Sequence, residues 1–202
     1  MRVPRALFAG VILVWAGLGV CGSLLLERYN ATPGERGPVP PHWPEATRLE
    51  RTPGRPILAV FAHPECPCTR ATLEVLGEIA AQLRGALDLE VVIVDDVADP
   101  DRGEIAARAR AIPGVRVVID HDQAEAHRFG ALTSGHTVLY GGDGALRFAG
   151  GITDARGQVG ASAGRAQITA LVRLDRTDRD RRGAGATPVF GCELVAQEQS
   201  VP

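Results

Sequence analysis

The most constraining feature of this chain is a pair of cysteines at the junction of an apolar strand and a helix. The apolar run from Pro56 to Ala62 predicts a buried strand. Pro67 suits the first position of a helix, and apolar residues follow it at helical spacing. Cys66 and Cys68 are therefore expected at a helix N-terminus, where unpaired N–H groups and the helix dipole favour a thiolate over a thiol. The junction predicts a reactive sulfur site.

Strand and helix patterns alternate through the rest of the chain. Strands are expected at 57–62, 87–95, 115–119, 137–140 and 145–148, and helices at 67–84, 99–112, 122–129 and 165–174. Asp99 and Pro100 suit the N-cap and first position of the second of these helices. Glycines at 141, 142 and 144 predict a hairpin between the last two strands. The alternation predicts an α/β fold, with a mixed central sheet covered by helices on both faces.

A second clear signal lies near the N-terminus, where the stretch from Leu7 to Leu26 carries no charge. A helix of that length is about 30 Å long and can cross a bilayer. Arg2 and Arg5 precede the stretch, so the positive-inside rule places residues 1–6 in the cytoplasm and the domain outside. A cleaved signal peptide is the rival interpretation, but the run is long and no clear small-residue cleavage site follows it. We predict a single-pass anchor (7–26) in the cytoplasmic membrane and a periplasmic domain.

Composition divides the remaining chain into three parts. Residues 27–55 are rich in proline and glycine and predict an extended linker. Residues 56–175 form the predicted domain, and residues 176–202 a tail that is mostly exposed apart from Pro188 to Phe190. The formal net charge of −2 gives no basic surface for nucleic acid, and the absence of lysine excludes Schiff-base chemistry.

The order of elements resembles the thioredoxin fold, in the branch that holds periplasmic thiol oxidoreductases, peroxiredoxins and copper-delivering Sco proteins. A closer resemblance is to the membrane-anchored, RedB-like thioredoxin-domain proteins. The residues that carry it are His63-Pro64, Cys66 to Arg70, Thr133 to Thr137, Gly150 to Thr153, Arg156-Gly157 and Thr187 to Cys192. The resemblance implies thiol–disulfide exchange with the thiols or disulfides of other proteins, a membrane redox protein among them.

Three departures from the thioredoxin pattern are visible. One residue, Pro67, separates the cysteines where thioredoxins have two. Gly135 stands where thioredoxins carry a cis-proline, and Val60 stands at the position of their buried carboxylate. The group that moves protons is therefore missing or replaced, and His63 and Glu65 are the candidate replacements.

We assign the attacking thiolate to Cys66, the residue nearer the helix end, and the resolving thiol to Cys68. No cofactor is needed for this chemistry. Cys192 is a candidate for a further thiol or for a cap on the site. The residues expected to support the cysteines are His63, Pro67, Thr69, Arg70, Gly135 and His136.

Two alternatives remain open. The first is a Sco-like copper-binding or copper-delivery protein, with Cys66, Cys68 and His136 as ligands, because thiolates and imidazole suit Cu(I). Sco cysteines are spaced more widely, however, and their histidine lies slightly earlier. The second is a redox-inactive binding module that holds a partner in the groove beside the cysteines.

Overall fold

A six-stranded sheet in the order β3-β2-β1-β4-β5-β6 organises the computed structural model, which describes residues 5–94, 103–175 and 184–194. The strands are β1 (Ile57–Ala62), β2 (Asp88–Val94), β3 (Val115–Asp120), β4 (Thr137–Tyr140), β5 (Leu146–Gly150) and β6 (Gly185–Ala186). The helices of this part are α2 (Pro67–Gln82), α3 (Glu104–Arg110), α4 (Ala124–Arg128) and α5 (Ala163–Asp175). The predicted α/β class and mixed sheet are confirmed, and the fold is thioredoxin-like.

The sheet combines parallel and antiparallel pairs around the central strand β1. β1, β2 and β3 are parallel, because the helices α2 and α3 return the chain between them. β4 is antiparallel to both β1 and β5, which makes the predicted hairpin. The cysteine motif follows the carboxyl end of the central strand β1, where the sheet reverses from parallel to antiparallel neighbours.

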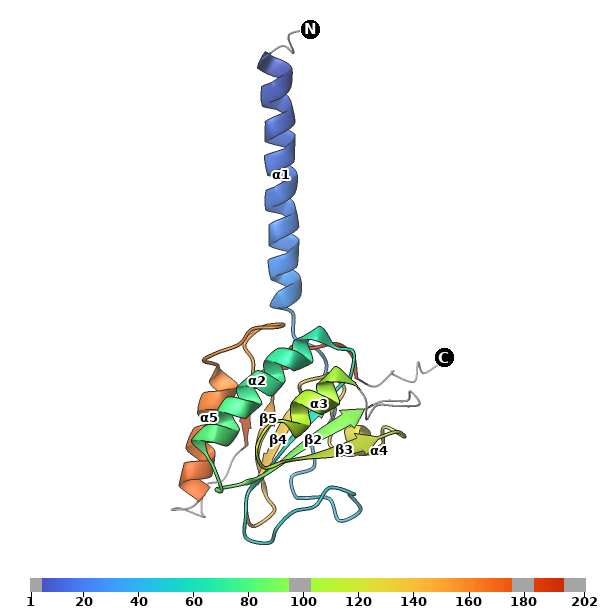
Figure 1. Ribbon diagram of the computed structural model, residues 1–202, viewed down its shortest axis with the longest axis vertical. Coiled ribbons are helices and arrows are strands. Elements are labelled where there is room, and N and C mark those ends of the chain that lie inside the picture. The colour runs from blue at the N-terminus through green and yellow to red at the C-terminus, as the bar shows by residue number, and fades with distance from the viewer. Residues whose placement is uncertain (1–4, 95–102, 176–183, 195–202) are drawn as a thin grey trace. The chain divides into compact units, whose positions relative to one another are not determined.

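Successive side chains of a strand point to opposite faces of the sheet, so the core is divided between the two faces. Leu58, Val60 and Ala62 of β1 pack on the face covered by α2, α3 and α5. Ile57, Ala59 and Phe61 belong to the other core cluster, together with Phe129 beside α4. Figure 1 shows α2 between α5 and α3 in front of the sheet.

The predicted linker needs correction, because residues 33–55 are part of the domain. Leu49 is buried in the second core cluster, and the Trp43 ring lies 5.3 Å from the Tyr140 ring and 5.4 Å from the Phe129 ring, between centroids. Arg48 also pairs with the buried carboxylate of Asp120. A proline-rich segment lacks the periodic pattern of a helix or strand, and its few apolar anchors give no local sign of where they dock.

The predicted tail is corrected in part. Val189 and Phe190 are buried, as expected, but the described part of the tail, residues 184–194, also adds the edge strand β6 and buries Leu194. The expected start of a helix at Asp99 and Pro100 lies outside the described residues, and described helix α3 has Gly103 at its N-cap.

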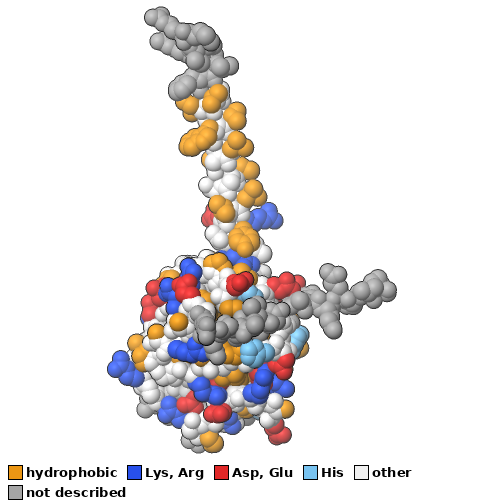
Figure 2. Space-filling model, turned by 45° about the vertical axis from the view of Figure 1, so that its right-hand side comes forward, with side chains coloured by type: hydrophobic (Ala, Val, Ile, Leu, Met, Phe, Trp, Pro, Cys, Tyr) orange, Lys and Arg blue, Asp and Glu red, His pale blue; other side chains and the backbone are white. Residues whose placement is uncertain are grey.

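Helix α1 (Arg5–Asn30) forms a separate unit from residues 33–202. Its stretch Ala9–Asn30 is long and apolar enough to cross a membrane, with a mean hydropathy of 2.2. Large apolar side chains stand exposed around it, Trp15 at 77% and Leu13 at 74% among them, and Figure 2 shows them along the helix. The predicted helix is confirmed, while its insertion into a membrane and its orientation stay predictions.

Candidate functional site

The site is built on the first turn of α2. Cys66 is the N-cap residue and Pro67 opens the helix, as the proline predicted. The backbone N–H of Thr69 donates to the carbonyl of Cys66 (3.0 Å), and the N–H of Cys66 donates to the carbonyl of His63 (3.3 Å). These bonds fix a tight turn between β1 and α2, so the Cys66 sulfur lies where the helix leaves its backbone donors free.

Polar groups on three segments hold this turn in place. His63 donates its backbone N–H to the hydroxyl of Ser134 (3.0 Å), and its Nδ1 accepts from the N–H of Glu65 (3.1 Å). The hydroxyls of Thr69 and Ser134 bond to each other at 2.9 Å. His63 thus shapes the turn, and Ser134 connects the end of β1, the start of α2 and the loop before β4.

A third thiol joins the pair. The Sγ of Cys192 lies 2.9 Å from the Sγ of Cys66, and the backbone N–H of Cys192 lies 3.4 Å from the same sulfur. Cys66 is only 2% exposed, while Cys68 and Cys192 are partly exposed. The candidate site is therefore a cluster of three cysteines in which Cys66 lies innermost.

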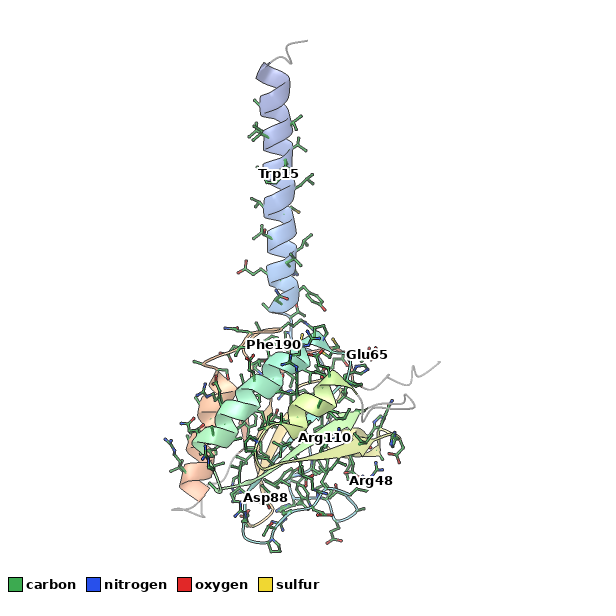
Figure 3. The ribbon with its side chains drawn as sticks, viewed as in Figure 1. Trp15, Arg48, Glu65, Asp88, Arg110 and Phe190 are labelled. Carbon is green, nitrogen blue, oxygen red and sulfur yellow. The ribbon has the colours of Figure 1, made fainter. Side chains whose placement is uncertain are left out.

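The tail that carries Cys192 is held by backbone contacts on both sides of it. Ser134 donates its N–H to the carbonyl of Cys192, and Leu194 donates to Leu132, each at 2.8 Å. A Cβ built on Gly191 would lie 1.9 Å from the carbonyl oxygen of Ser134, so only glycine fits there. Figure 3 shows Phe190 and Glu65 at one end of the domain and Asp88 at the other.

The surroundings make Cys66 the most acidic of the three thiols. Burial raises its pKa, but hydrogen bonds from the side chain and N–H of Cys192, the N–H of Cys68 and the hydroxyl of Thr69 outweigh burial, so the pKa of Cys66 is lowered. Burial and the neighbouring Cys66 sulfur raise the pKa of Cys68. Burial and the same sulfur raise the pKa of Cys192 to about 12.

Arg156 places a positive charge beside the outer two thiols. It donates to the carbonyl of Gly191, which holds the loop between β5 and α5 against the tail. Its charge acts to lower the pKa of both Cys68 and Cys192, against the larger effect of burial. The loop from Gly150 to Gly164 thus contributes one residue to the site.

Gly135 lies where α2, β1 and the tail meet. Its φ of +90° is in the region that favours glycine, and its N–H donates to the carbonyl of Phe61 at 2.7 Å. A Cβ there would lie 3.2 Å from the Thr72 hydroxyl. Arg70, by contrast, pairs with Glu104 of α3 on an exposed surface (2.7 Å), so the structure does not bring it to the cysteines.

His136 is fully buried, and neither ring nitrogen has a hydrogen-bond partner. Its ring lies 6.3 Å from the Phe61 ring, in centroid distance, and burial and the charge of Arg36 lower its pKa to about 3. In the described part of the chain, no three His, Cys, Asp or Glu side chains gather closely enough to hold a metal ion. The copper ligands Cys66, Cys68 and His136 are therefore not assembled, and the copper hypothesis stays a prediction.

Sequence reasoning missed the roles of Ser134 and Arg156. Both stand in motifs that carry the family resemblance, and that was the only signal for them. The hydrogen-bond partners of Ser134 lie in two distant segments, the turn between β1 and α2 and the tail, and Arg156 contacts a residue 35 positions away. No local pattern predicts such contacts.

No protein-family model matches the chain, and neither does any curated protein. Solved structures similar to it include a hypothetical protein from Sinorhizobium meliloti 1021, with 20% identity, a TM-score of 0.57 and coverage of 81% of this chain and 93% of that chain. Another is an uncharacterized conserved protein from Geobacillus kaustophilus, with 15% identity, a TM-score of 0.59 and coverage of 84% and 95%.

A secreted Mycobacterium tuberculosis disulfide oxidoreductase homologous to E. coli DsbE is also similar, at 17% identity and 60% and 83% coverage. Its TM-score of 0.44 is too low to carry an argument about this chain. At these identities the likenesses show a shared fold alone. The RedB-like resemblance stays a prediction.

Proposed function

We propose that this chain is a membrane-anchored, extracytoplasmic thiol–disulfide oxidoreductase that works through its Cys-Pro-Cys motif. The observation that carries the proposal is the environment of Cys66. Its sulfur lies at the N-cap of α2 and accepts several hydrogen bonds, which lower its pKa despite burial. A thiolate is the reactive form of cysteine, and such an environment is typical of catalytic thiols.

The exchange runs in two steps. The Cys66 thiolate attacks one sulfur of a partner disulfide, so a bond forms between Cys66 and the partner while the partner's second sulfur leaves and takes up a proton. Cys68 then loses its proton and attacks the Cys66 sulfur. The reduced partner leaves, and Cys66 and Cys68 are joined as a disulfide. The same steps in reverse oxidise a partner dithiol.

The raised pKa of Cys68 suits the second step. While Cys66 is a thiolate, its negative charge opposes a second charge one residue away. Once Cys66 is bonded to the partner that charge is gone, and Cys68 ionises more readily. The low pKa of Cys66 also makes it the better leaving group in the reverse of the first step, when the partner's second thiolate breaks the mixed disulfide.

The small ring that a Cys66–Cys68 disulfide would close favours a role in exchange over a purely structural role. A Cys66–Cys68 bridge closes a ring of about 11 atoms that contains Pro67, whose φ is fixed. So short a loop adds little stability, and a constrained bridge is more easily reduced. The partners proposed are protein thiols or disulfides, with a membrane redox partner among them, because α1 would keep the domain close to a membrane.

Two matched variants test the assignment in the full chain, each with Cys21→Ser and Cys192→Ser to remove the other thiols. One also carries Cys68→Ser and keeps Cys66 alone, and the other carries Cys66→Ser and keeps Cys68 alone. With a disulfide-bonded protein substrate at pH 7, we expect the Cys66 variant to form a mixed disulfide roughly tenfold or more faster than the Cys68 variant. Mass spectrometry of the quenched reaction measures both.

Equal rates, or a faster Cys68 variant, would contradict the assignment of the nucleophile. If neither variant reacts and the parent chain still binds its partner after losing both cysteines, the redox-inactive binding module is the correct hypothesis.

A further inference from the structure

The position of Cys192 suggests a second internal disulfide. Cys192 lies 126 residues after Cys66 in sequence, and yet their sulfurs are 2.9 Å apart. A disulfide bond is about 2.0 Å long, so closing it needs a movement of less than about 1 Å. The tail is already fixed beside Cys66 by the bond from the N–H of Ser134 to the carbonyl of Cys192 and by the bond from the N–H of Leu194 to the carbonyl of Leu132.

We propose that the stable oxidised form of this protein contains a Cys66–Cys192 disulfide. This disulfide forms from the Cys66–Cys68 disulfide of the exchange cycle, when Cys192 displaces Cys68 from the Cys66 sulfur. The proposal rests on the proposed function for the origin of that first disulfide. It makes the tail a redox element of the site rather than a passive cover.

The transfer is an isomerisation with no net oxidation. The Cys192 thiol gives up its proton, and its sulfur attacks the Sγ of Cys66. The Cys66–Cys192 bond forms while the Cys66–Cys68 bond breaks, and the electron pair and the proton pass to Cys68. The loss of the Cys66 negative charge in the first disulfide removes one cause of the high pKa of Cys192.

Loop length favours the second disulfide over the first. A bridge across 126 positions restricts the unfolded chain far more than one across two positions. The Cys66–Cys192 bridge also lacks the constraint of the small ring that a Cys66–Cys68 bridge closes around Pro67. Oxidation should therefore stabilise the fold when Cys192 is present and have little effect when it is absent.

The second disulfide also presents a sulfur that partners can reach. Cys66 is buried, whereas Cys192 is partly exposed, and a pocket of about 320 Å³ opens beside the tail between Gly191, Glu193 and Arg156. A partner thiolate that attacks Cys192 would expel Cys66, the thiol with the lowered pKa and hence the better leaving group. A second partner thiol then frees Cys192, so the partner leaves as a disulfide and this protein is reduced by two electrons.

The test uses the full chain with Cys21→Ser, in detergent, oxidised with glutathione disulfide and then alkylated and cut with trypsin. Trypsin does not cut before Pro56, so residues 52–70 hold both Cys66 and Cys68, while residues 183–202 hold Cys192. We expect these two peptides to be recovered joined, with one alkylated thiol. The Cys68→Ser variant should give the same joined pair, and Cys66→Ser should lose it.

Thermal unfolding supplies the second measurement. Oxidation should raise the Tm of the parent chain and of Cys68→Ser by roughly 5–15 °C, and change that of Cys192→Ser by no more than about 2 °C. Recovery of peptide 183–202 fully alkylated, beside a peptide 52–70 closed on itself, would overturn the inference and leave the proposed function standing. Full alkylation of Cys66 and Cys68 after the same oxidation would instead count against the proposed function.

Discussion

Cys66 and Cys68 are separated by one residue, but their surroundings give them opposite properties. The hydrogen bonds that lower the pKa of Cys66 come from Cys192, Cys68 and Thr69. Cys68 lies further along α2, where burial and the neighbouring Cys66 charge raise its pKa. The difference arises from donors placed by the fold and not from the two residues themselves.

The Thr69 hydroxyl offers a direct test of this explanation. Replacing it by valine (Thr69→Val) removes the smallest of the effects that lower the pKa of Cys66, together with the hydroxyl's bonds to His63 and Ser134. The pKa of Cys66 therefore rises and the thiolate fraction at pH 7 falls. In the variant that keeps Cys66 alone, we expect alkylation by iodoacetamide to slow about three- to tenfold at pH 7. The loss should vanish at a pH well above the pKa, where Cys66 is ionised in both proteins.

Thr72→Val is the matched control. Thr72 is also a buried threonine of α2, but its hydroxyl bonds to the carbonyl of Cys68 (3.4 Å) and not to a sulfur. In the Thr72→Val variant, the rate of Cys66 alkylation plotted against pH should have the same midpoint as in the parent protein. Profiles that coincide for Thr69→Val and the parent would remove Thr69 from the site.

The chemistry of individual residues was only partly predictable from sequence. Pro67 identified the helix start, and therefore the position of Cys66, because proline suits only a few backbone positions. The contacts of Cys192, Ser134 and Arg156 join segments far apart in the chain, and tertiary packing alone brings them together. His136 was a candidate ligand because of its chemistry, but the fold buries its ring beside Phe61.

Among the elements, the tail segment 187–194 bears most directly on the site. It leaves β6, passes Gly151 and Gly34 with backbone hydrogen bonds, and ends on Leu132. Its path was not predicted, because it runs as a loop with one isolated bridge, from Glu193 to Thr133, and has no hydrophobic periodicity. The strand β4, with its β-branched and aromatic residues, was predicted at its observed bounds of Thr137–Tyr140.

Gly191→Ala tests whether the tail covers Cys66. The added methyl would collide with the backbone carbonyl of Ser134, so the tail must shift away. We expect a loss of stability of roughly 1–3 kcal/mol, measured by denaturant unfolding, and faster reaction of Cys66 with a bulky maleimide. The yield of joined peptides after oxidation should fall as well.

Gly77→Ala provides the comparison, since Gly77 lies inside α2 with no atom within 4 Å of an added Cβ. That variant should gain about 0.5–1 kcal/mol and leave the reactivity of Cys66 unchanged. A Gly191→Ala protein as stable and as slowly alkylated as the parent would show that the tail does not protect the sulfur.

For the whole molecule, sequence identified the class of fold more reliably than the limits of the domain. The alternation of strands and helices was sufficient for the central sheet, because buried strands and amphipathic helices carry strong periodic signals. Residues 33–55 have no such signal, but Trp43 and Leu49 complete the core on one face. The predicted boundary at residue 56 was therefore drawn too late.

The proposed membrane topology is tested on the complete chain. An alkaline phosphatase fused after Pro202 folds only where its own disulfides form, so we expect high phosphatase activity and no signal from a cytoplasmic fluorescent reporter at the same place. Arg2→Ala with Arg5→Ala removes the positive charges before the apolar stretch that begins at Leu7 and should lower the phosphatase activity. Activity confined to the cytoplasmic reporter would reverse the proposed orientation.

The distance along the chain between Cys66 and Cys192 also sets an order of assembly during synthesis. The ribosome makes Cys192 126 residues after Cys66, which at about 5–20 residues per second is a delay of roughly 6–25 s. During that interval a newly made Cys66 has Cys68 as its near neighbour and lacks the tail above it. We therefore expect the nascent chain to pass through a period in which the Cys66 thiol is open to oxidants and folding catalysts and lacks the hydrogen bonds from Cys192 that lower its pKa. That period ends when the tail docks.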